Sequence, residues 1–519
     1  MIKNAILSLL FIACVHYLPA QPPCPVIPLP AIATKQSGVF TCNAGTTIIA
    51  TRDSLQPVAR YLQKQLQKIN GATLQIGQTK KGSTIQLVSK PGNNAEGYTL
   101  NMKPGTVTIT GHSTAGVFYG VISLLQLAAH SNATTIPCWN ISDAPLFTWR
   151  GYMLDESRYF FGKEKVKQIL DQMAFYKLNK FHWHLTDQPG WRIEIKKYPK
   201  LTEIGGIGNH FDSTAPAAYY TQEEIKEIVA YAAERFITVV PEIDMPGHAT
   251  AANRAYPEFS GGGSARYPEF TFNPGYEGTY QYLTDILKET DALFPSQMIH
   301  LGGDEVSFGN EKWLSNPHIQ NLMAQQGLKD ARAVELYFIK RMADTLTAMN
   351  NKTLAWDEVA QADLQPKQTI VFWWRHDQPK QLTTSLQKGY YVVLCPRLPF
   401  YFDFVQDSAH VSGRKWGKEK LFNPLQGVYN FSLARYNIPE TQAPQVLGIQ
   451  ANMWTETIKT NKRLDFMMYP RLCAFAEAAW TKPAQKNYAL FTRRLQGHLR
   501  WLKKQGIHYY EPAAPEPIH

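Results

Sequence analysis

The sequence predicts an α/β protein in which a closed (β/α)8 barrel follows a small, sandwich-like α+β domain. Eight short apolar runs after residue 144, with amphipathic segments between them, predict the barrel. A different alternation of short β runs and helical stretches before residue 143 predicts the smaller domain. We therefore divide the chain into a signal peptide (1–20), an N-terminal α/β domain (21–143) and the barrel with a C-terminal helix (144–519).

The eight apolar runs have the length and composition of buried parallel strands. Eight such strands are the number that closes a barrel. They cover residues 149–154, 180–185, 236–241, 298–302, 353–356, 369–374, 390–394 and 446–451.

The segments between the runs carry helix signals. Residues 221–224 (Thr-Gln-Glu-Glu) form a capping box, and the apolar residues that follow fall on one helical face. Near the end of the chain, 488–504 has leucines at helical spacing, so we expect a helix there that packs on the barrel. In the N-terminal domain, short β runs at 47–50, 83–88 and 106–110 alternate with helical stretches at 58–69 and 115–129.

The first 20 residues resemble an export signal. Lys3 precedes an apolar stretch over 5–15, and Ala20 is a small residue before the expected cut. The chain is therefore expected to be exported to the periplasm, the cell surface or the medium. An imperfect lipoprotein-type box at 10–14 leaves a lipid anchor on Cys14 open. The apolar stretch is too short to span a membrane in the mature chain.

Composition excludes several classes of function. The formal net charge of +11 is spread along 519 residues without a long basic block, and no nucleic-acid-binding motif is present. The five cysteines after residue 20 lack metal-type spacing. Cys24, Cys42 and Cys138 could pair in an exported protein, whereas Cys395 and Cys473 are expected in the core. No cofactor or metal is predicted, and the oligomeric state is left open.

Two adjacent carboxylates, Asp304 and Glu305, follow a short apolar run and two glycines. Because neighbouring carboxylates oppose each other's ionisation, one is expected to keep its proton to higher pH, as a general acid requires. Side chains adjacent on one strand diverge, so we do not expect the two to act on opposite sides of one carbon.

Acids, a histidine and indoles follow nearly every apolar run, and that end of the strands carries the active site in barrels. Aromatic faces ringed by carboxylates are typical of a carbohydrate pocket. The residues in question are Asp187, His248, Asp304, Glu305, Trp356, Trp373, Tyr401, Asp403, Trp454 and Glu456.

Several of these blocks resemble glycoside hydrolase family 20, the β-N-acetylhexosaminidases. The resemblance covers nearly the whole mature chain and includes 149–155 (Trp-Arg-Gly-Tyr-Met-Leu-Asp), 241–248, 300–305 (His-Leu-Gly-Gly-Asp-Glu) and 454–456 (Trp-Thr-Glu). It implies an exo-acting, retaining hydrolase that removes terminal N-acetylglucosamine or N-acetylgalactosamine. The 2-acetamido group of the substrate then attacks its own anomeric carbon through an oxazolinium intermediate.

The resemblance also implies roles for single residues. Glu305 is the acid and then the base, Asp304 stabilises the oxazolinium, and Asp187 with His248 forms a relay to Glu305. Arg150 is expected to hold the C3 and C4 hydroxyls. The remaining implied contacts are walls of the acetamido pocket from Trp356, Trp373 and Trp454, with Trp374 in the core, a hydrogen bond from Tyr401, and hydroxyl acceptors at Asp403 and Glu456.

One departure from the family pattern follows Asp187. The family usually continues Asp-Gln-Gly-Trp there, whereas this chain has Gln188, Pro189, Gly190 and Trp191. An acid is replaced and a proline stiffens the loop, which puts the local loop shape in doubt.

Three alternatives stay open from the sequence. His182 and His184 alternate on one strand and can bind a metal, so a metal-dependent amidohydrolase is one alternative. A lacto-N-biosidase, which releases a disaccharide, shares the same motifs. A non-catalytic sugar-binding barrel is the third and is disfavoured by the intact Asp304 and Glu305.

Overall fold

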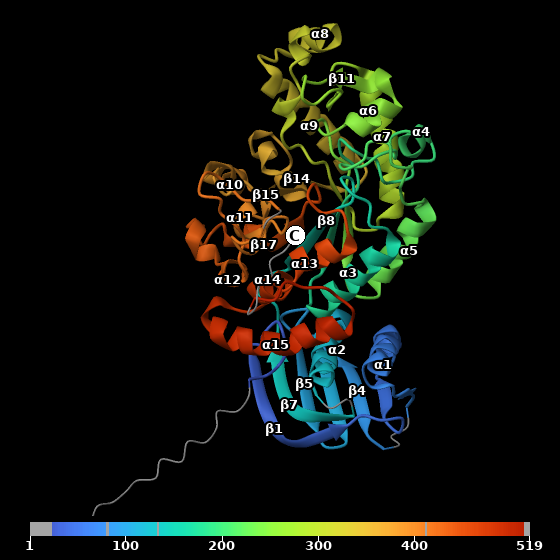
Figure 1. Ribbon diagram of the computed structural model, residues 1–519, viewed down its shortest axis with the longest axis vertical. Helices are drawn as coiled ribbons and strands as arrows, with labels where there is room; N and C mark the ends of the chain where they lie inside the picture. Colours follow the sequence, from blue (N-terminus) through green and yellow to red (C-terminus); the bar gives the residue numbers. More distant parts are fainter. Residues whose placement is uncertain (1–22, 79–81, 132–133, 411–412, 513–519) are drawn as a thin grey trace, which may run out of the picture.

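The computed structural model describes residues 23–78, 82–131, 134–410 and 413–512. Figure 1 shows an elongated molecule with a sheet domain at one end and the barrel above it. The predicted signal segment and Cys14 lie outside the described residues. Within those residues, no helix combines the length and apolar character needed to cross a bilayer.

The N-terminal domain is a seven-stranded mixed sheet of spatial order β1-β7-β5-β6-β4-β2-β3. Three strands match predicted runs, whereas β1, β3, β5 and β7 were not among those runs. β1 is mostly exposed, β3 has only two residues, and the partly alternating exposure of β5 and β7 weakens the apolar signal. The bounds are β1 (Ile32–Thr41), β2 (Thr47–Ala50), β3 (Gln75–Ile76), β4 (Thr84–Ser89), β5 (Tyr98–Lys103), β6 (Thr106–Gly111) and β7 (Thr135–Asp143).

Two helices pack on the sheet, α1 (Gln56–Asn70) and α2 (Thr114–Ala129). The side chain of Ser113 caps α2 by accepting from two backbone amides of its first turn. Nearly every residue of α2 is buried, because the helix lies between the sheet and the barrel. Gln126 on α2 donates to the carbonyl of Phe175, which ends the first barrel helix.

The barrel is closed by eight parallel strands, which confirms the predicted fold class. All eight predicted runs form these strands, within two residues at each end. They are β8 (Trp149–Asp155), β9 (Lys180–His184), β10 (Thr238–Glu242), β13 (Met298–His300), β14 (Lys352–Trp356), β15 (Thr369–Trp373), β16 (Tyr391–Leu394) and β17 (Val446–Met453).

Helices surround the barrel unevenly. Full helices follow most strands, but β14 and β15 are joined only by the 3-10 turns η5 (Asp357–Gln361) and η6 (Pro366–Gln368). The main surrounding helices are α3 (Lys163–Phe175), α5 (Gln222–Ala233), α7 (Glu277–Leu293), α9 (Ala331–Ala348), α10 (Pro379–Gln387), α12 (Leu425–Tyr429), α13 (Asn461–Met468) and α14 (Arg471–Trp480). The predicted capping box at Thr221 opens α5.

Shorter elements extend the loops at the C-terminal end of the barrel. They are α4 (Lys200–Glu203), α6 (Thr250–Ala255), the hairpin of β11 (Ser260–Gly262) and β12 (Thr271–Phe272), α8 (Pro317–Gln326) and α11 (Arg397–Phe400). In Figure 1, α8, β11 and α6 lie at the end of the molecule opposite the N-terminal sheet.

The C-terminal helix α15 (Tyr488–Lys504) lies across the boundary between the domains. Its Trp501 ring stacks on Phe175 at 5.6 Å, and His498 Nε2 lies 2.9 Å from the carbonyl oxygen of Pro25. The helix therefore packs on the barrel, as predicted, and also holds the start of the N-terminal domain.

Buried ion pairs join the two domains. Arg150 donates to both carboxylate oxygens of Glu96 at 2.8 and 2.9 Å and also donates to the Tyr119 hydroxyl. Close by, Lys177 Nζ lies 3.4 Å from Asp143. Although burial alone would raise it, the pKa of the Glu96 carboxyl is lowered by Arg150. This bidentate pair crosses the domain boundary, with Arg150 buried and the Glu96 side chain 19% exposed.

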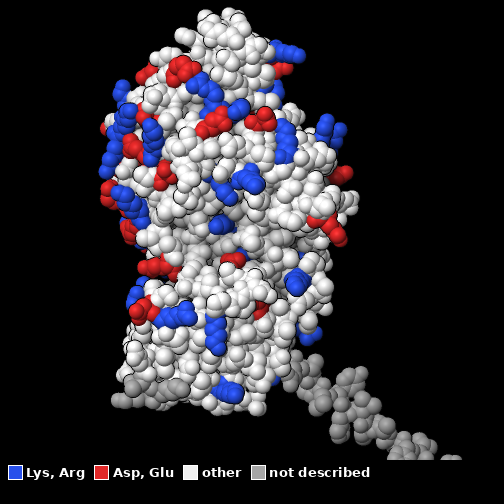
Figure 2. All heavy atoms as spheres, turned by 180° about the vertical axis from the view of Figure 1, so that it is seen from behind, with Lys and Arg blue, Asp and Glu red and all other residues white. Residues whose placement is uncertain are grey.

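Two further expectations concern cysteines and charge. The five cysteines of the described chain are free and buried, so the possible pairing among Cys24, Cys42 and Cys138 is not formed. Cys395 and Cys473 are core residues, as expected. On the face seen in Figure 2, acidic and basic side chains are interspersed, most densely along one edge.

Arg150→Met is expected to destabilise the protein by about 3–5 kcal/mol, because Glu96 would keep a buried charge without a partner. Chemical denaturation followed by circular dichroism measures this loss. The matched control is Lys340→Met, which removes an exposed pair with Asp344 and is expected to cost under about 1 kcal/mol. Equal losses for the two variants would contradict the interdomain role of Arg150.

Candidate active site

A cavity of about 770 Å³ opens at the C-terminal ends of the barrel strands. Asp304 and Glu305 lie in it, just after β13, as the sequence predicted for a barrel site. Of the other predicted residues, His248, Trp356, Tyr401, Trp454 and Glu456 line the cavity, whereas Arg150, Trp373, Asp187 and Asp403 do not.

The turn after β13 places the two carboxylates. Gly302 and Gly303 both have positive φ, at 68° and 86°, and Glu305 is itself left-handed at φ 53°. A Cβ on Gly302 would lie 1.8 Å from Asp244 Oδ1, so only glycine fits there. The glycine pair thus lets the chain leave the strand and turn both acids into the cavity.

Asp304 and Glu305 lie beside each other rather than apart. Oxygens of both approach the same atom, His248 Nε2, at 3.5 and 3.8 Å. The predicted divergence of the two side chains is therefore wrong, because they sit on a turn and not on a strand. The two acids nevertheless share one side of the site, so they do not flank a bound sugar as an ordinary glycosidase pair does.

His248 connects Glu305 to Asp187. Its Nδ1 lies 2.9 Å from Asp187 Oδ1, and its Nε2 faces the two acids. Burial lowers the pKa of His248, but Asp187 and Asp304 outweigh it and raise the pKa to about 9. The histidine is therefore a cation at neutral pH, held by Asp187 on one side and directed at Glu305 on the other.

Glu305 has the protonation behaviour of an acid catalyst. Burial is the main cause that raises the pKa of its carboxyl above 4.5, and the nearby Asp304 adds to this while His248 opposes it. A third of its side chain is exposed to the cavity. The geometry fits a group that gives a proton to something bound there.

Arg158, and not Arg150, lines the cavity beside Asp187. Its Nη1 lies 2.7 Å from Asp187 Oδ2, and its guanidinium covers the Trp454 ring at 5.0 Å. Arg150 lies near the opposite end of β8, buried against Glu96. Trp149 packs inside the barrel against Phe372, so the neighbouring Arg150 points outward. Arg158 follows the C-terminal end of β8, and that position is the signal in the sequence that could have identified it.

Four aromatic side chains wall the inner end of the cavity: Trp356, Trp374, Tyr401 and Trp454. Trp374 and Tyr401 are nearly parallel, 6.1 Å apart, and Trp356 and Trp454 lie 5.8 Å apart. The assignment of the wall to Trp373 and the core to Trp374 is wrong. Trp373 points outward, with its ring 5.0 Å from Tyr436 and its indole N–H donating to the Gln378 carbonyl.

Two predicted acids lie beyond this wall. Glu456 reaches the cavity and pairs with Arg414 at 2.7 Å, whereas Asp403 is buried 3.5 Å from the same arginine. Burial raises the pKa of Asp403 to about 7. Its two oxygens are buried and have no hydrogen-bond partner among the described residues, and Asp403 does not line the cavity.

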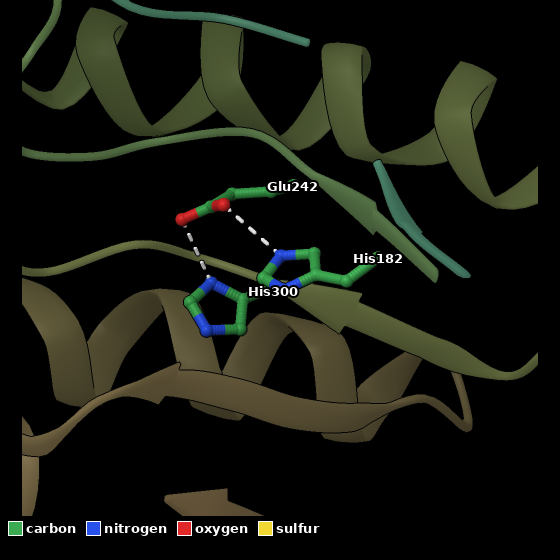
Figure 3. Close-up of side chains that lie close together, drawn as sticks. All are labelled: His182, Glu242 and His300. Atoms are coloured by element: carbon green, nitrogen blue, oxygen red, sulfur yellow. Dashed lines mark ion pairs between the residues drawn. The ribbon is translucent and has the colours of Figure 1, made fainter. Parts of the chain in front are cut away.

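A buried carboxylate, Glu242 at the end of β10, supports the floor of the site. Its oxygens accept from the Trp356 indole N–H at 2.9 Å and lie 2.6 Å from His184 Nδ1. Figure 3 shows His182 and His300 facing its two oxygens, each at 3.0 Å. His184 continues to Asp187 through Nε2 at 3.0 Å. Sequence reasoning gave Glu242 no role.

This cluster bears on the metal alternative. His182, Glu242 and His300 have the residue types of a metal site and ligand atoms within 4.8 Å of one another. All three are fully buried beneath the cavity. His182 and His184 both face Glu242 and do not line the cavity, so they are not placed as the ligands of an open catalytic metal.

Comparisons with known proteins agree with this geometry. The sequence model described as glycosyl hydrolase family 20, catalytic domain, matches residues 147–483, and that of family 20, domain 2, matches 23–144. A beta-hexosaminidase of Porphyromonas gingivalis is 36% identical over 95% of this chain, which spans 65% of the relative's length. A beta-hexosaminidase of Vibrio furnissii is 34% identical, with 87% of this chain and 76% of the relative covered.

Solved structures give the same picture. The GH20 exo beta-N-acetylglucosaminidase of Vibrio harveyi, in complex with N-acetylglucosamine, superposes with a TM-score of 0.88 at 33% identity. The match covers 96% of this chain and 80% of the Vibrio harveyi chain. A beta-N-acetylhexosaminidase of Bacteroides fragilis has a TM-score of 0.82 at 30% identity, covering 93% and 96% of the two chains.

Glu242→Gln is expected to lower the free energy of unfolding and to reduce the dependence of that free energy on pH. Burial lowers the pKa of His184, but Glu242 and Asp187 raise it to about 10. His184 therefore contributes stability that is full below about pH 6.5 and is lost as the pH rises through about 10. The variant should be less stable at neutral pH by about 3–5 kcal/mol. It should also lose less on going to pH 10 than the wild type does.

Urea unfolding at neutral pH and at about pH 10 measures both effects. Glu277→Gln, which removes an exposed carboxylate paired with Arg341, is the matched control and should change neither value by more than about 1 kcal/mol. A Glu242→Gln protein with wild-type stability and the same pH slope would show that the buried charges are not coupled.

Proposed function

This chain belongs to glycosyl hydrolase family 20, and we propose that it is an exo-acting, retaining β-N-acetylhexosaminidase that removes terminal N-acetylglucosamine or N-acetylgalactosamine. The observation that carries the proposal is the convergence of Asp304, Glu305 and His248 at the mouth of a closed aromatic pocket. Family membership and the buried positions of His182 and His184 remove the support for a metal-dependent amidohydrolase.

The first step is attack by the substrate's own acetamido oxygen on the anomeric carbon, with Glu305 giving its proton to the departing glycosidic oxygen. Asp304 accepts the acetamido N–H and balances the positive oxazolinium that forms. Asp304 suits this role because its Oδ1 is buried and has no hydrogen-bond partner within the described chain. The acetamido group lies between the aromatic walls, with Tyr401 as the hydrogen-bond donor.

The second step reverses the proton flow. Glu305, now ionised, takes a proton from water as the water attacks the anomeric carbon and breaks its bond to the acetamido oxygen. The anomeric carbon is inverted twice, so its configuration is retained overall. The cationic His248, held by Asp187, stabilises the ionised form of Glu305 between the two steps. Arg158, Asp403 and Glu456 are the groups that we assign to the sugar hydroxyls. Arg158 replaces Arg150 in this role because it lines the cavity.

We also propose, from the pattern of residues 1–20 alone, that the protein acts after export. Periplasmic, surface-bound and secreted forms all place the site where free glycans occur.

Side-by-side hydrolysis of three p-nitrophenyl glycosides tests the proposed activity: the β-N-acetylglucosaminide, the β-N-acetylgalactosaminide and the plain β-glucoside. The enzyme is expected to hydrolyse the two acetamido sugars but not the glucoside, because only the acetamido sugars carry the internal nucleophile. Turnover of the glucoside at a comparable rate would contradict substrate assistance. No turnover of any of the three would contradict the proposed function.

The variants Glu305→Gln and Asp304→Asn are a matched pair that separates the two acid roles. Glu305→Gln should reduce kcat by about 10²- to 10⁴-fold on a disaccharide and less on the nitrophenyl sugar, whose leaving group needs little protonation. Asp304→Asn should reduce kcat by about 10²- to 10³-fold on both substrates, because the loss of the carboxylate destabilises the oxazolinium whichever leaving group departs. Wild-type rates for Asp304→Asn would refute its role.

The same pair predicts a pH dependence. Because burial raises the pKa of Glu305, the wild type should lose activity on disaccharides as the pH rises through that value, when the acid loses its proton. In Glu305→Gln this alkaline decline should disappear.

A further inference from the structure

The cavity has two ends, which differ in exposure. The inner end is closed by the aromatic wall, in which Trp356 is 1% exposed and Trp454 is 7% exposed. At the outer end, Phe308 is 45% exposed and borders the solvent. Asp304 and Glu305 lie between the two ends. Since the inner end is blocked by the packed core around Glu242, an exo-acting site places the terminal sugar inside and the leaving group outside.

An aromatic row runs outward from the catalytic group. The Phe270 ring lies 4.7 Å from His248, and Tyr267 lies 5.5 Å from Phe270. Tyr267 and Phe308 are nearly parallel at 5.8 Å, with an interplanar angle of 14°. These side chains line the same cavity as Glu305 and provide a surface on which a second sugar ring can pack.

The charges of the two ends also differ. At the inner end the arginines are already neutralised, Arg158 by Asp187 and Arg414 by Glu456. At the outer end His210, Arg254 and Arg266 line the cavity, and no carboxylate of the described chain pairs with any of them. Of the acids that line the cavity, Glu456 lies at the inner end, and Asp304 and Glu305 lie between the two ends.

The three basic side chains come from two loops that are separate in sequence. His210 lies in the loop after β9, and Arg254 and Arg266 lie in the connection between β10 and α7. Arg254 donates to the carbonyls of Gly205 and Ile207, which fixes its guanidinium beside the first loop without neutralising its charge. Arg266 is exposed, with its guanidinium 5.2 Å from the Tyr267 ring.

We propose that the outer end of the cavity is a leaving-group subsite for an anionic sugar. Its aromatic row would pack the ring, and Arg254, Arg266 and His210 would face a carboxylate or a sulfate on that ring. The proposal rests on the proposed hexosaminidase function and adds the chemical class of the residue that follows the terminal N-acetylhexosamine. Unpaired cations around a concave pocket raise the local concentration of anionic substrates, and salt screens the effect.

Two substrate pairs that differ only in the charged group test the subsite. One pair is N-acetylglucosaminyl-β-1,4-glucuronic acid and its glucose counterpart. The other is N-acetylglucosaminyl-β-1,3-galactose with and without a sulfate at position 6 of the galactose. The readout is kcat/KM for release of N-acetylglucosamine at low and high salt, in the wild type, Arg266→Gln and the control Arg493→Gln. Arg493 is exposed on α15 and gives the same change in net charge away from the cavity.

A higher kcat/KM for the anionic member of either pair is expected, and which pair responds identifies a carboxylate or a sulfate as the group. The ratio of kcat/KM for the anionic substrate to kcat/KM for its neutral counterpart should fall by about two- to fivefold in Arg266→Gln, which is the range for one exposed charge pair. High salt should reduce this ratio too. Arg493→Gln should leave it unchanged. Equal kcat/KM within both pairs, or a preference that Arg266→Gln does not reduce, would overturn the subsite. Failure of the neutral disaccharides and of the nitrophenyl sugar together would instead overturn the hexosaminidase function.

Discussion

The site depends on one ionised carboxylate, Glu242, that lies within the barrel and has no contact with water. Burial raises the pKa of that carboxyl, but His300, His184 and His182 outweigh it and hold the pKa well below its ordinary value. A buried charge is tolerated only when it is paired and hydrogen-bonded, so the side chains around Glu242 have little freedom. They include Trp356, which forms part of the pocket wall. The wall is therefore fixed from below by electrostatics as well as by packing.

From this carboxylate, a chain of alternating acidic side chains and histidines leads to the mouth of the barrel. It runs from Glu242 through His184, Asp187 and His248 to Glu305, with contacts of 2.6, 3.0, 2.9 and 3.8 Å in that order. Each histidine in the chain lies between carboxylates. The last, longest contact joins the group that must gain and lose a proton, so the least constrained member is the one that reacts.

Much of the architecture was predictable because it follows from local patterns. All eight barrel strands were visible as apolar runs, since buried parallel strands need apolar residues on both faces. The catalytic pair was visible because two glycines and two acids follow the fourth run. The edge strand β1 left no comparable trace, because most of its residues are exposed. Glu242 was also missed, since an acid after a strand looks the same whether it lines a pocket or supports one.

The sequence by itself determined the family and the barrel and singled out two adjacent acids after the fourth strand, because these depend on residue types in a fixed order. Only the tertiary structure decided which neighbour faces the pocket. Arg150 and Arg158 lie at opposite ends of one strand. Trp373 and Trp374 are neighbours that point to opposite sides, because a shift of one residue along a strand reverses the direction of a side chain. The direction is set by closure of the barrel and by packing of the N-terminal domain, which no local pattern records.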